Sequence, residues 1–137
     1  MWAIQNSKAK ALFYSRIHTN GQTQGQFDNF NVALHVGDDS RKVEANRKLV
    51  AAEFNVDPNQ VIWPNLMHST NALEITSNND IVTEADIMFT TTREIVLTTM
   101  SADCVPVLAI AQNHDFILTA HVGWKGARDK IAVTIEK

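Results

Sequence analysis

Hydrophobic positions in the first half of the chain follow a helical period most clearly over residues 41–54. Val43, Val50 and Phe54 fall near one face of a helix there, while the charged side chains lie elsewhere. The preceding residues 38–40, Asp-Asp-Ser, offer short side-chain oxygens that accept hydrogen bonds from free backbone N–H groups at a helix start. The pattern therefore predicts an amphipathic helix over residues 41–54, ended by the Asn-Val-Asp-Pro segment that follows.

Beyond this helix the apolar segments become shorter and richer in β-branched residues, which is typical of strands. The predicted strands cover residues 60–67, 72–76, 87–92, 94–99, 105–111 and 116–120. Residues 112–115 are predicted to be a tight connection between the last two strands, which are expected to be antiparallel neighbours. Both strands are nearly all apolar, so their sheet should be covered on both faces. A helical spacing returns with Ala127, Ile131 and Ile135, while residues 21–31 are loop-like.

Composition limits the kind of protein that this chain can be. A chain of 137 residues, 45% hydrophobic and 20% charged, suits one globular domain over residues 1–137. Its net charge of −3 and the absence of a Lys/Arg block argue against nucleic-acid binding. No apolar stretch approaches the ~20 residues that span a membrane. A single cysteine and the lack of an apolar leader favour a cytoplasmic setting.

Three candidate metal ligands follow three predicted strands: His68, Cys104 and His121. If those strand ends converge, the side chains supply one sulfur and two nitrogens. Zinc held by three protein ligands keeps a fourth position for water, whose pKa falls toward ~7. Their separations match no local zinc motif, however, and each side chain has an ordinary structural alternative. Cys104 could be a small buried hydrophobe, His121 a hydrogen-bonded sheet histidine, and His68 a loop residue.

Four sequence segments together resemble one known family. They are Asn-Val-Ala-Leu-His-Val-Gly-Asp-Asp at 31–39, Glu-Ala-Asn-Arg-Lys-Leu at 44–49, Ala-Asp-Cys-Val-Pro-Val-Leu at 102–108 and His-Val-Gly-Trp-Lys-Gly at 121–126. In this order they resemble the YfiH-like laccase-domain family, over about residues 12–137. Its members have been called polyphenol oxidases and are understood as zinc-dependent purine nucleoside phosphorylases that also deaminate adenosine. The resemblance implies an α/β (α+β) fold with a mixed β-sheet core flanked by helices.

The resemblance also implies which residues form the site. The zinc and catalytic positions of the family fall on His68, Cys104 and His121. Three residues around His68 depart from the family pattern, since Leu-Met replaces Gln-Val before it and Ser69 replaces the glycine after it. Family members are roughly twice as long as this chain, which resembles their amino-terminal half. A homo-oligomer, or association with the missing half, is expected to complete the protein.

Phosphorolysis of a purine nucleoside also requires groups that hold phosphate and move protons. Arg47 is a candidate phosphate clamp, with an exposed helix arginine as its alternative. Lys125, in the turn bracketed by two glycines, is a second candidate for phosphate, and His35 is a candidate for lining the pocket. Asp103 could orient a histidine or transfer a proton, or it could brace the turn beside Cys104.

Three functional hypotheses follow. The first is a zinc enzyme that acts on a purine nucleoside and phosphate. The second is a metal-free amide hydrolase acting on cell-wall precursors, with Cys104 as nucleophile and His121 as base. The third is a non-catalytic interaction domain. A copper oxidase is the least favoured, because the clusters of multicopper enzymes need more histidines than the five of this chain.

Overall fold

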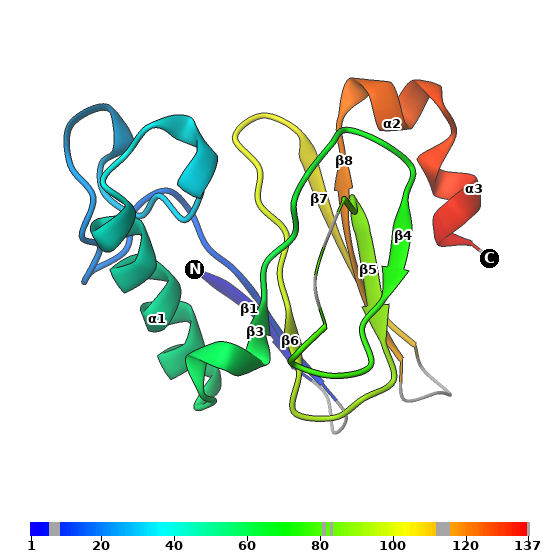
Figure 1. The fold of residues 1–137 in the computed structure, drawn as a ribbon, viewed down its shortest axis with the longest axis horizontal. Helices are drawn as coiled ribbons and strands as arrows, with labels where there is room; N and C mark the ends of the chain where they lie inside the picture. Colours follow the sequence, from blue (N-terminus) through cyan, green and yellow to red (C-terminus); the bar gives the residue numbers. More distant parts are fainter. Residues whose placement is uncertain (6–8, 81, 83, 112–115, 137) are drawn as a thin grey trace. The chain divides into compact units, whose positions relative to one another are not determined.

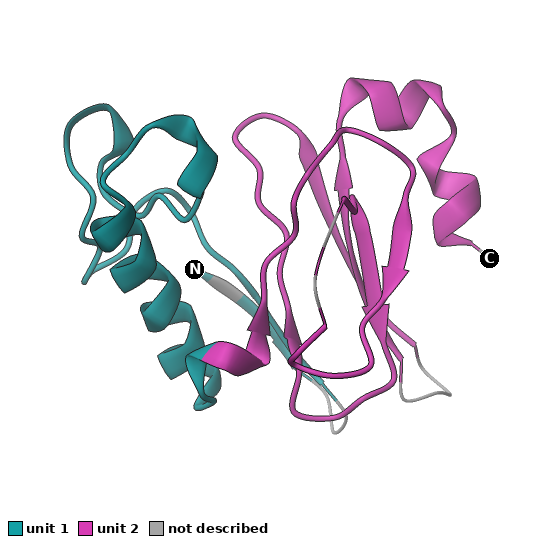
Figure 2. Ribbon diagram, in the orientation of Figure 1, with its two compact units in different colours: residues 1–58 teal, residues 59–137 magenta. Residues whose placement is uncertain are grey.

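The computed structural model describes residues 1–5, 9–80, 82, 84–111 and 116–136. It divides into two compact units, residues 1–58 (unit 1) and residues 59–137 (unit 2), which Figure 2 draws in teal and magenta. The expectation of a single domain stays a prediction. No helix in the described ranges is both long and apolar enough to cross a membrane.

Unit 1 combines a small strand pair with one long helix. Its elements are β1 (Trp2–Gln5), β2 (Lys10–Phe13), the 3₁₀ helices η1 (Gly25–Phe27) and η2 (Leu34–Val36), and α1 (Ser40–Phe54). β1 and β2 pair antiparallel, with Gln5 opposite Lys10. The hydrophobic pattern did not predict this pair, because four residues per strand are too few to show a clear alternation.

Helix α1 confirms the helix predicted over residues 41–54, with its start one residue earlier. Asp39 is the N-cap, and its side chain accepts a hydrogen bond from the Arg41 backbone N–H at 3.0 Å. The helix ends at Asn55, which adopts the left-handed conformation with φ of 56°. Val43 and Val50 are buried on its inner face, as the spacing predicted.

Unit 2 contains two sheets and two short helices (Figure 1). From residue 58 onward the elements are η3 (Pro58–Gln60), β3 (Val61–Ile62), β4 (Ala72–Glu74), β5 (Ile87–Thr90), β6 (Val96–Leu97), β7 (Val105–Ile110), β8 (Ile117–Val122), α2 (Trp124–Arg128) and α3 (Ile131–Ile135). All six strands predicted in this half overlap an observed strand, and β8 extends two residues beyond its predicted end. β3 and β6 are much shorter than predicted, since Pro64 follows β3 closely and has no N–H to continue a ladder.

The larger sheet of unit 2 has the strand order β4-β5-β8-β7 and is mixed. β4 pairs parallel with β5, whereas β5–β8 and β7–β8 are antiparallel. The prediction of antiparallel β7 and β8 is therefore confirmed, and the connection predicted at residues 112–115 lies outside the described residues. β3 and β6 form a separate parallel pair. Together these elements confirm an α/β (α+β) class with a mixed sheet.

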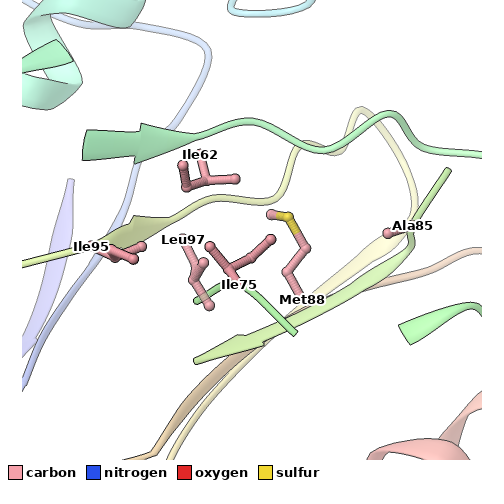
Figure 3. Close-up of a cluster of buried hydrophobic side chains, with 6 residues drawn as sticks. All are labelled: Ile62, Ile75, Ala85, Met88, Ile95 and Leu97. Atoms are coloured by element: carbon pink, nitrogen blue, oxygen red, sulfur yellow. The ribbon is translucent and has the colours of Figure 1, made fainter. Parts of the chain in front are cut away.

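Two hydrophobic clusters of unit 2 draw on alternate residues of the central strand β5. Figure 3 shows the first, in which Met88 of β5 and Ile75 pack with residues of the β3–β6 pair. The second joins Ile87 of β5 to β8 and to Ile131 of α3. Both faces of β5 and β8 are thus covered, as predicted. For β7 that prediction was wrong, because it is an edge strand whose first residue, Val105, is 59% exposed.

The helix predicted after residue 126 is instead two short helices. α2 ends at Arg128 with Asp129 as its C-cap, and Lys130 adopts a left-handed conformation with φ of 63°. The helical path cannot continue through a left-handed residue, so α3 begins anew at Ile131. Ile131 and Ile135 of α3 nevertheless pack against the sheet, with Ile131 only 2% exposed.

Candidate metal centre

Strand pairing in unit 2 brings three distant segments to one point. His121 lies in β8, Cys104 directly precedes β7, and His68 lies in the segment between β3 and β4. The β7–β8 register places Val105 opposite Val122, so Cys104 lies beside the end of β8. One ligand atom from each of His68, Cys104 and His121 lies within 4.8 Å of the other two. The structure therefore places together all three candidate ligands of the sequence.

His121 is the buried member of this cluster. Its side chain is only 3% exposed, and Nδ1 lies 2.8 Å from Oδ1 of Asp86. The backbone N–H of His121 also donates to the Asp86 carbonyl at 2.8 Å, as β8 runs alongside β5. The His68 ring stands edge-on to the His121 ring, with centroids 4.8 Å apart and an interplanar angle of 88°.

Asp86 is a residue of the site that sequence reasoning missed. Its carboxylate is fully buried and accepts hydrogen bonds from the backbone N–H groups of Met67, His68 and Ser69, and from the Ser69 hydroxyl. Burial raises the pKa of Asp86, but the bonds from Ser69 and His121 outweigh it and leave the pKa below its usual value. The signal in the sequence was a carboxylate placed directly before the apolar strand β5.

Gly123 has no side chain and so leaves room for the side chains of the three ligands. A Cβ atom at this position would lie 2.8 Å from Cδ2 of His68, 3.2 Å from Sγ of Cys104 and 3.6 Å from Cε1 of His121. The backbone at Gly123 is ordinary, with φ of −83° and ψ of 171°. Glycine is needed here because of the close approach of His68 and Cys104, and not because of its conformational freedom.

Cys104 is partly exposed and lies beside Asp103. Sγ is 3.6 Å from Oδ1 of Asp103, and the Ser101 hydroxyl donates to the Cys104 carbonyl. Burial raises the pKa of the Cys104 thiol, and the hydrogen bond and negative charge of Asp103 raise it further. Without a cation nearby, this environment favours the neutral thiol.

The other candidate residues divide between the two units. Lys125 lies in α2 just after Gly123, exposed, with Nζ 5.8 Å from the centroid of the Trp124 ring. Arg47 lies in α1 of unit 1, and its Nε donates to the Val32 carbonyl at 2.8 Å. His35 lies in η2 of unit 1 and is exposed. The roles expected for these three residues stay predictions.

The donor set fits a small tetrahedral cation. Thiolates and imidazoles are the ligand types that zinc takes most often. In a tetrahedral site with ordinary zinc–ligand bond lengths, the ligand atoms lie ~3.3–3.6 Å apart. The cluster spans up to 4.8 Å, so side-chain shifts of about 1 Å would complete the coordination. Only three protein ligands converge within the described ranges, which leaves a position for water or substrate.

Comparison with curated proteins finds relatives that share a name. A purine nucleoside phosphorylase of Corynebacterium glutamicum is 33% identical over 137 residues, covering 97% of this chain and 55% of the relative. The purine nucleoside phosphorylase YfiH of Escherichia coli is 31% identical over 112 residues, covering 82% of this chain and 46% of the relative. The chain thus spans about half the length of the curated relatives it matches.

Solved structures and a family model agree with these relatives. A Neisseria meningitidis protein of the family DUF152 superposes with a TM-score of 0.84 at 28% identity, over 96% of this chain and 52% of the other. A hypothetical protein YfiH of Bacillus licheniformis gives 0.80 at 28% identity, over 85% and 47%. The family model described as multi-copper polyphenol oxidoreductase laccase matches residues 10–136. The chain belongs to this laccase-domain (YfiH) family, as the four sequence segments predicted.

Proposed function

We propose that this chain provides the metal site of a zinc-dependent purine nucleoside phosphorylase that also deaminates adenosine. Its substrates would be adenosine, inosine, guanosine or methylthioadenosine, with phosphate. The observation that carries the proposal is the convergence of His68, Cys104 and His121, in a chain whose relatives are named purine nucleoside phosphorylase.

Zinc suits the three ligands better than copper does. A thiolate with two imidazoles is a common zinc set, and the fourth position is free for catalysis. The family description refers to multicopper oxidation, but such clusters need more histidines than the five in this sequence. Zinc bound there would supply a Lewis acid that activates water for deamination at neutral pH.

Phosphorolysis gives the chain's other residues distinct tasks. A phosphate oxygen attacks C1′ of the ribose, the bond from C1′ to the purine breaks, and the departing base takes a proton. Lys125, in the same unit as the cluster, is the cation that we assign to phosphate. The roles expected from the sequence for Arg47 at phosphate and for His35 in the pocket wall, both residues of unit 1, stay predictions. Asp103, exposed beside Cys104, is assigned to proton transfer.

A metal-free hydrolase is the second candidate, and one geometric feature favours it. In space, Cys104 lies near His121, and His121 is hydrogen-bonded to Asp86, which is the arrangement of a nucleophile, a base and an orienting carboxylate. The raised pKa of the Cys104 thiol opposes this function, because an amide hydrolase needs the thiolate without the help of a cation. We therefore favour the metal enzyme.

The expected setting and partners belong to the same proposal. A cysteine that must stay reduced to bind metal suits the cytoplasm. Because the chain covers about half of its relatives, we propose that a second copy, or the remainder of a longer protein, completes the substrate site.

The decisive experiment incubates the purified chain with adenosine and phosphate, with and without added zinc. Adenine, inosine and ribose 1-phosphate should appear only with zinc, and Cys104→Ala should abolish both the products and stoichiometric zinc. Activity that survives chelation and is lost on alkylation of Cys104 would favour the hydrolase instead. A zinc-loaded chain that consumes no nucleoside, even when paired with the remainder of a longer relative, would favour a non-catalytic domain.

A further inference from the structure

We propose that Asp86 is the positioning residue of the metal cluster: it sets the tautomer of His121 and fixes the backbone of His68. This inference deepens the proposed function and rests on its metal site, but not on its substrate. The observation behind it is that a single buried carboxylate holds two of the three ligands by different routes.

The two carboxylate oxygens of Asp86 have different hydrogen-bond partners. Oδ1 lies 2.8 Å from Nδ1 of His121 and accepts the backbone N–H of His68 at 3.0 Å. Oδ2 accepts the backbone N–H of Met67 at 3.2 Å, and the backbone N–H and hydroxyl of Ser69 at 2.7 Å each. The three backbone N–H groups can only donate, and the Ser69 hydroxyl donates to Oδ2 while it accepts the backbone N–H of Asn71.

The imidazole of His121 can either donate or accept at Nδ1, so its role there depends on its partner, Asp86. An ionised carboxylate only accepts, so His121 donates from Nδ1 and keeps Nε2 without a proton. Nε2 is then the nitrogen available to a metal, and the Asp86 bond also fixes the orientation of the ring. The lowered pKa of Asp86 is consistent with this ionised form.

The same carboxylate fixes the loop that carries His68. Three successive backbone N–H groups, at Met67, His68 and Ser69, converge on Asp86. His68 has φ of 58°, a left-handed conformation that a residue other than glycine rarely adopts without support. Because the side chain of His68 is exposed, these backbone bonds are what holds the ligand toward the cluster.

Asp86→Asn is the informative variant, because it keeps the size and shape of the side chain. The amide offers one acceptor and one donor group where the site presents only donors. If its oxygen keeps the bonds to Ser69, its NH₂ faces His121 and the imidazole must accept at Nδ1. The proton then moves to Nε2, the nitrogen that faces the metal.

The test uses metal-free protein at a pH where the imidazole is neutral. Long-range ¹H–¹⁵N NMR should show the Nδ1–H tautomer of His121 in the wild type and a shift toward Nε2–H in Asp86→Asn. Zinc affinity, measured by competition with a chromophoric chelator, should fall by ~10–100-fold. Neither measurement needs a nucleoside, so their outcome is independent of whether the chain is a phosphorylase.

Asp80→Asn is the matched control. Asp80 also accepts several loop hydrogen bonds, from the backbone N–H groups of Thr76 and Ser77 and from their hydroxyls. It should lower stability without changing zinc affinity or the His121 tautomer. Ser69→Ala, which removes one hydroxyl donor to Asp86 and leaves the imidazole bond, should lower zinc affinity by less than Asp86→Asn does.

Two outcomes would overturn the proposal. One is an Nε2–H tautomer of His121 in the metal-free wild-type protein, a measurement that does not depend on whether any variant folds. The other is a folded Asp86→Asn protein whose zinc affinity stays within about twofold of wild type, or falls no further than that of Asp80→Asn.

Discussion

Each unit of the chain has a buried polar side chain that holds a loop, but the two side chains differ in kind. In unit 1, Asn46 of α1 is fully buried; its amide nitrogen donates to the carbonyls of Asn29 and Asn31, and its oxygen accepts from Gln22. In unit 2, the buried carboxylate of Asp86 only accepts. The first loop presents both carbonyls and an N–H, whereas the second presents donors only.

Each buried side chain matches the hydrogen-bonding groups of the loop that it holds. An amide matches a loop with mixed polarity and remains neutral, so unit 1 buries no charge at this point. A carboxylate matches a set of donors and brings a negative charge that orients an imidazole beside a metal site. The amide fixes a fold, while the carboxylate fixes a fold and also prepares the cluster for a cation.

The largest expected effect comes from removing His121, the ligand whose imidazole is hydrogen-bonded to Asp86. His121→Ala should abolish stoichiometric zinc, with affinity at least about 100-fold weaker. It should also lower the free energy of unfolding of the metal-free protein by about 3 kcal/mol, because a buried carboxylate loses its imidazole partner. Zinc content by mass spectrometry and urea denaturation of the metal-free protein measure the two effects.

His68→Ala is the matched variant for this experiment. It also removes a ligand, but its side chain is exposed, so the metal-free protein should lose less than about 1 kcal/mol. Equal losses of stability in His121→Ala and His68→Ala would show that the buried carboxylate of Asp86 is not stabilised by its hydrogen bond with the imidazole of His121.

The next effect tests the amide of unit 1. Asn46→Asp places a carboxylate against the carbonyl oxygens of Asn29 and Asn31, and should lower the free energy of unfolding by about 2–4 kcal/mol. Asn46→Ala should cost less, because it removes the bonds without adding a charge. Zinc affinity should remain within about twofold of wild type in both variants, as measured by chelator competition. A large loss of affinity would contradict the division of roles between the two buried side chains.

A smaller effect concerns the space around the ligands. Gly123→Ala would place Cβ 2.8 Å from His68, the exposed and more easily displaced histidine, and 3.2 Å from Cys104. Zinc affinity should fall by about 10-fold. Stability without metal should change by less than about 0.5 kcal/mol, since alanine tolerates this backbone conformation. An unchanged zinc affinity would show that the three ligands can close around the ion without the room that glycine leaves.

The sequence was sufficient for elements with a strong local signal. Helix α1 combined a capping Asp39 with a long apolar period, and both depend only on neighbouring residues. The ligand trio was different: residue type and position after three predicted strands made His68, Cys104 and His121 candidates, but their separations match no local motif. The family resemblance was needed to favour a metal site over their structural alternatives. Asp86 was missed because its partners lie 17 or more residues away in the chain.

The smallest predicted effect is spectroscopic, and it tests whether the interior of unit 1 favours neutral groups. Burial raises the pKa of Tyr14 to about 12, with the charge of Glu53 as a second cause, and its hydroxyl has no hydrogen-bond partner among the described residues. Tyr14 is the one tyrosine of the chain, so ultraviolet absorbance reports it alone. Its ionisation should have a midpoint of about 12 in the folded protein and ~10 in urea.

The sign of the accompanying stability change follows from the raised pKa. The unfolded chain loses its Tyr14 proton first, so this group's contribution to stability is complete below pH ~10 and declines as the pH rises toward ~12. Glu53→Gln should lower the folded midpoint only in part, because burial is the larger cause. If the midpoint of Tyr14 in the folded protein lay near ~10, burial in unit 1 would not disfavour the ionised phenol. Unit 1 would then not differ from unit 2, with its ionised Asp86, in excluding buried charge.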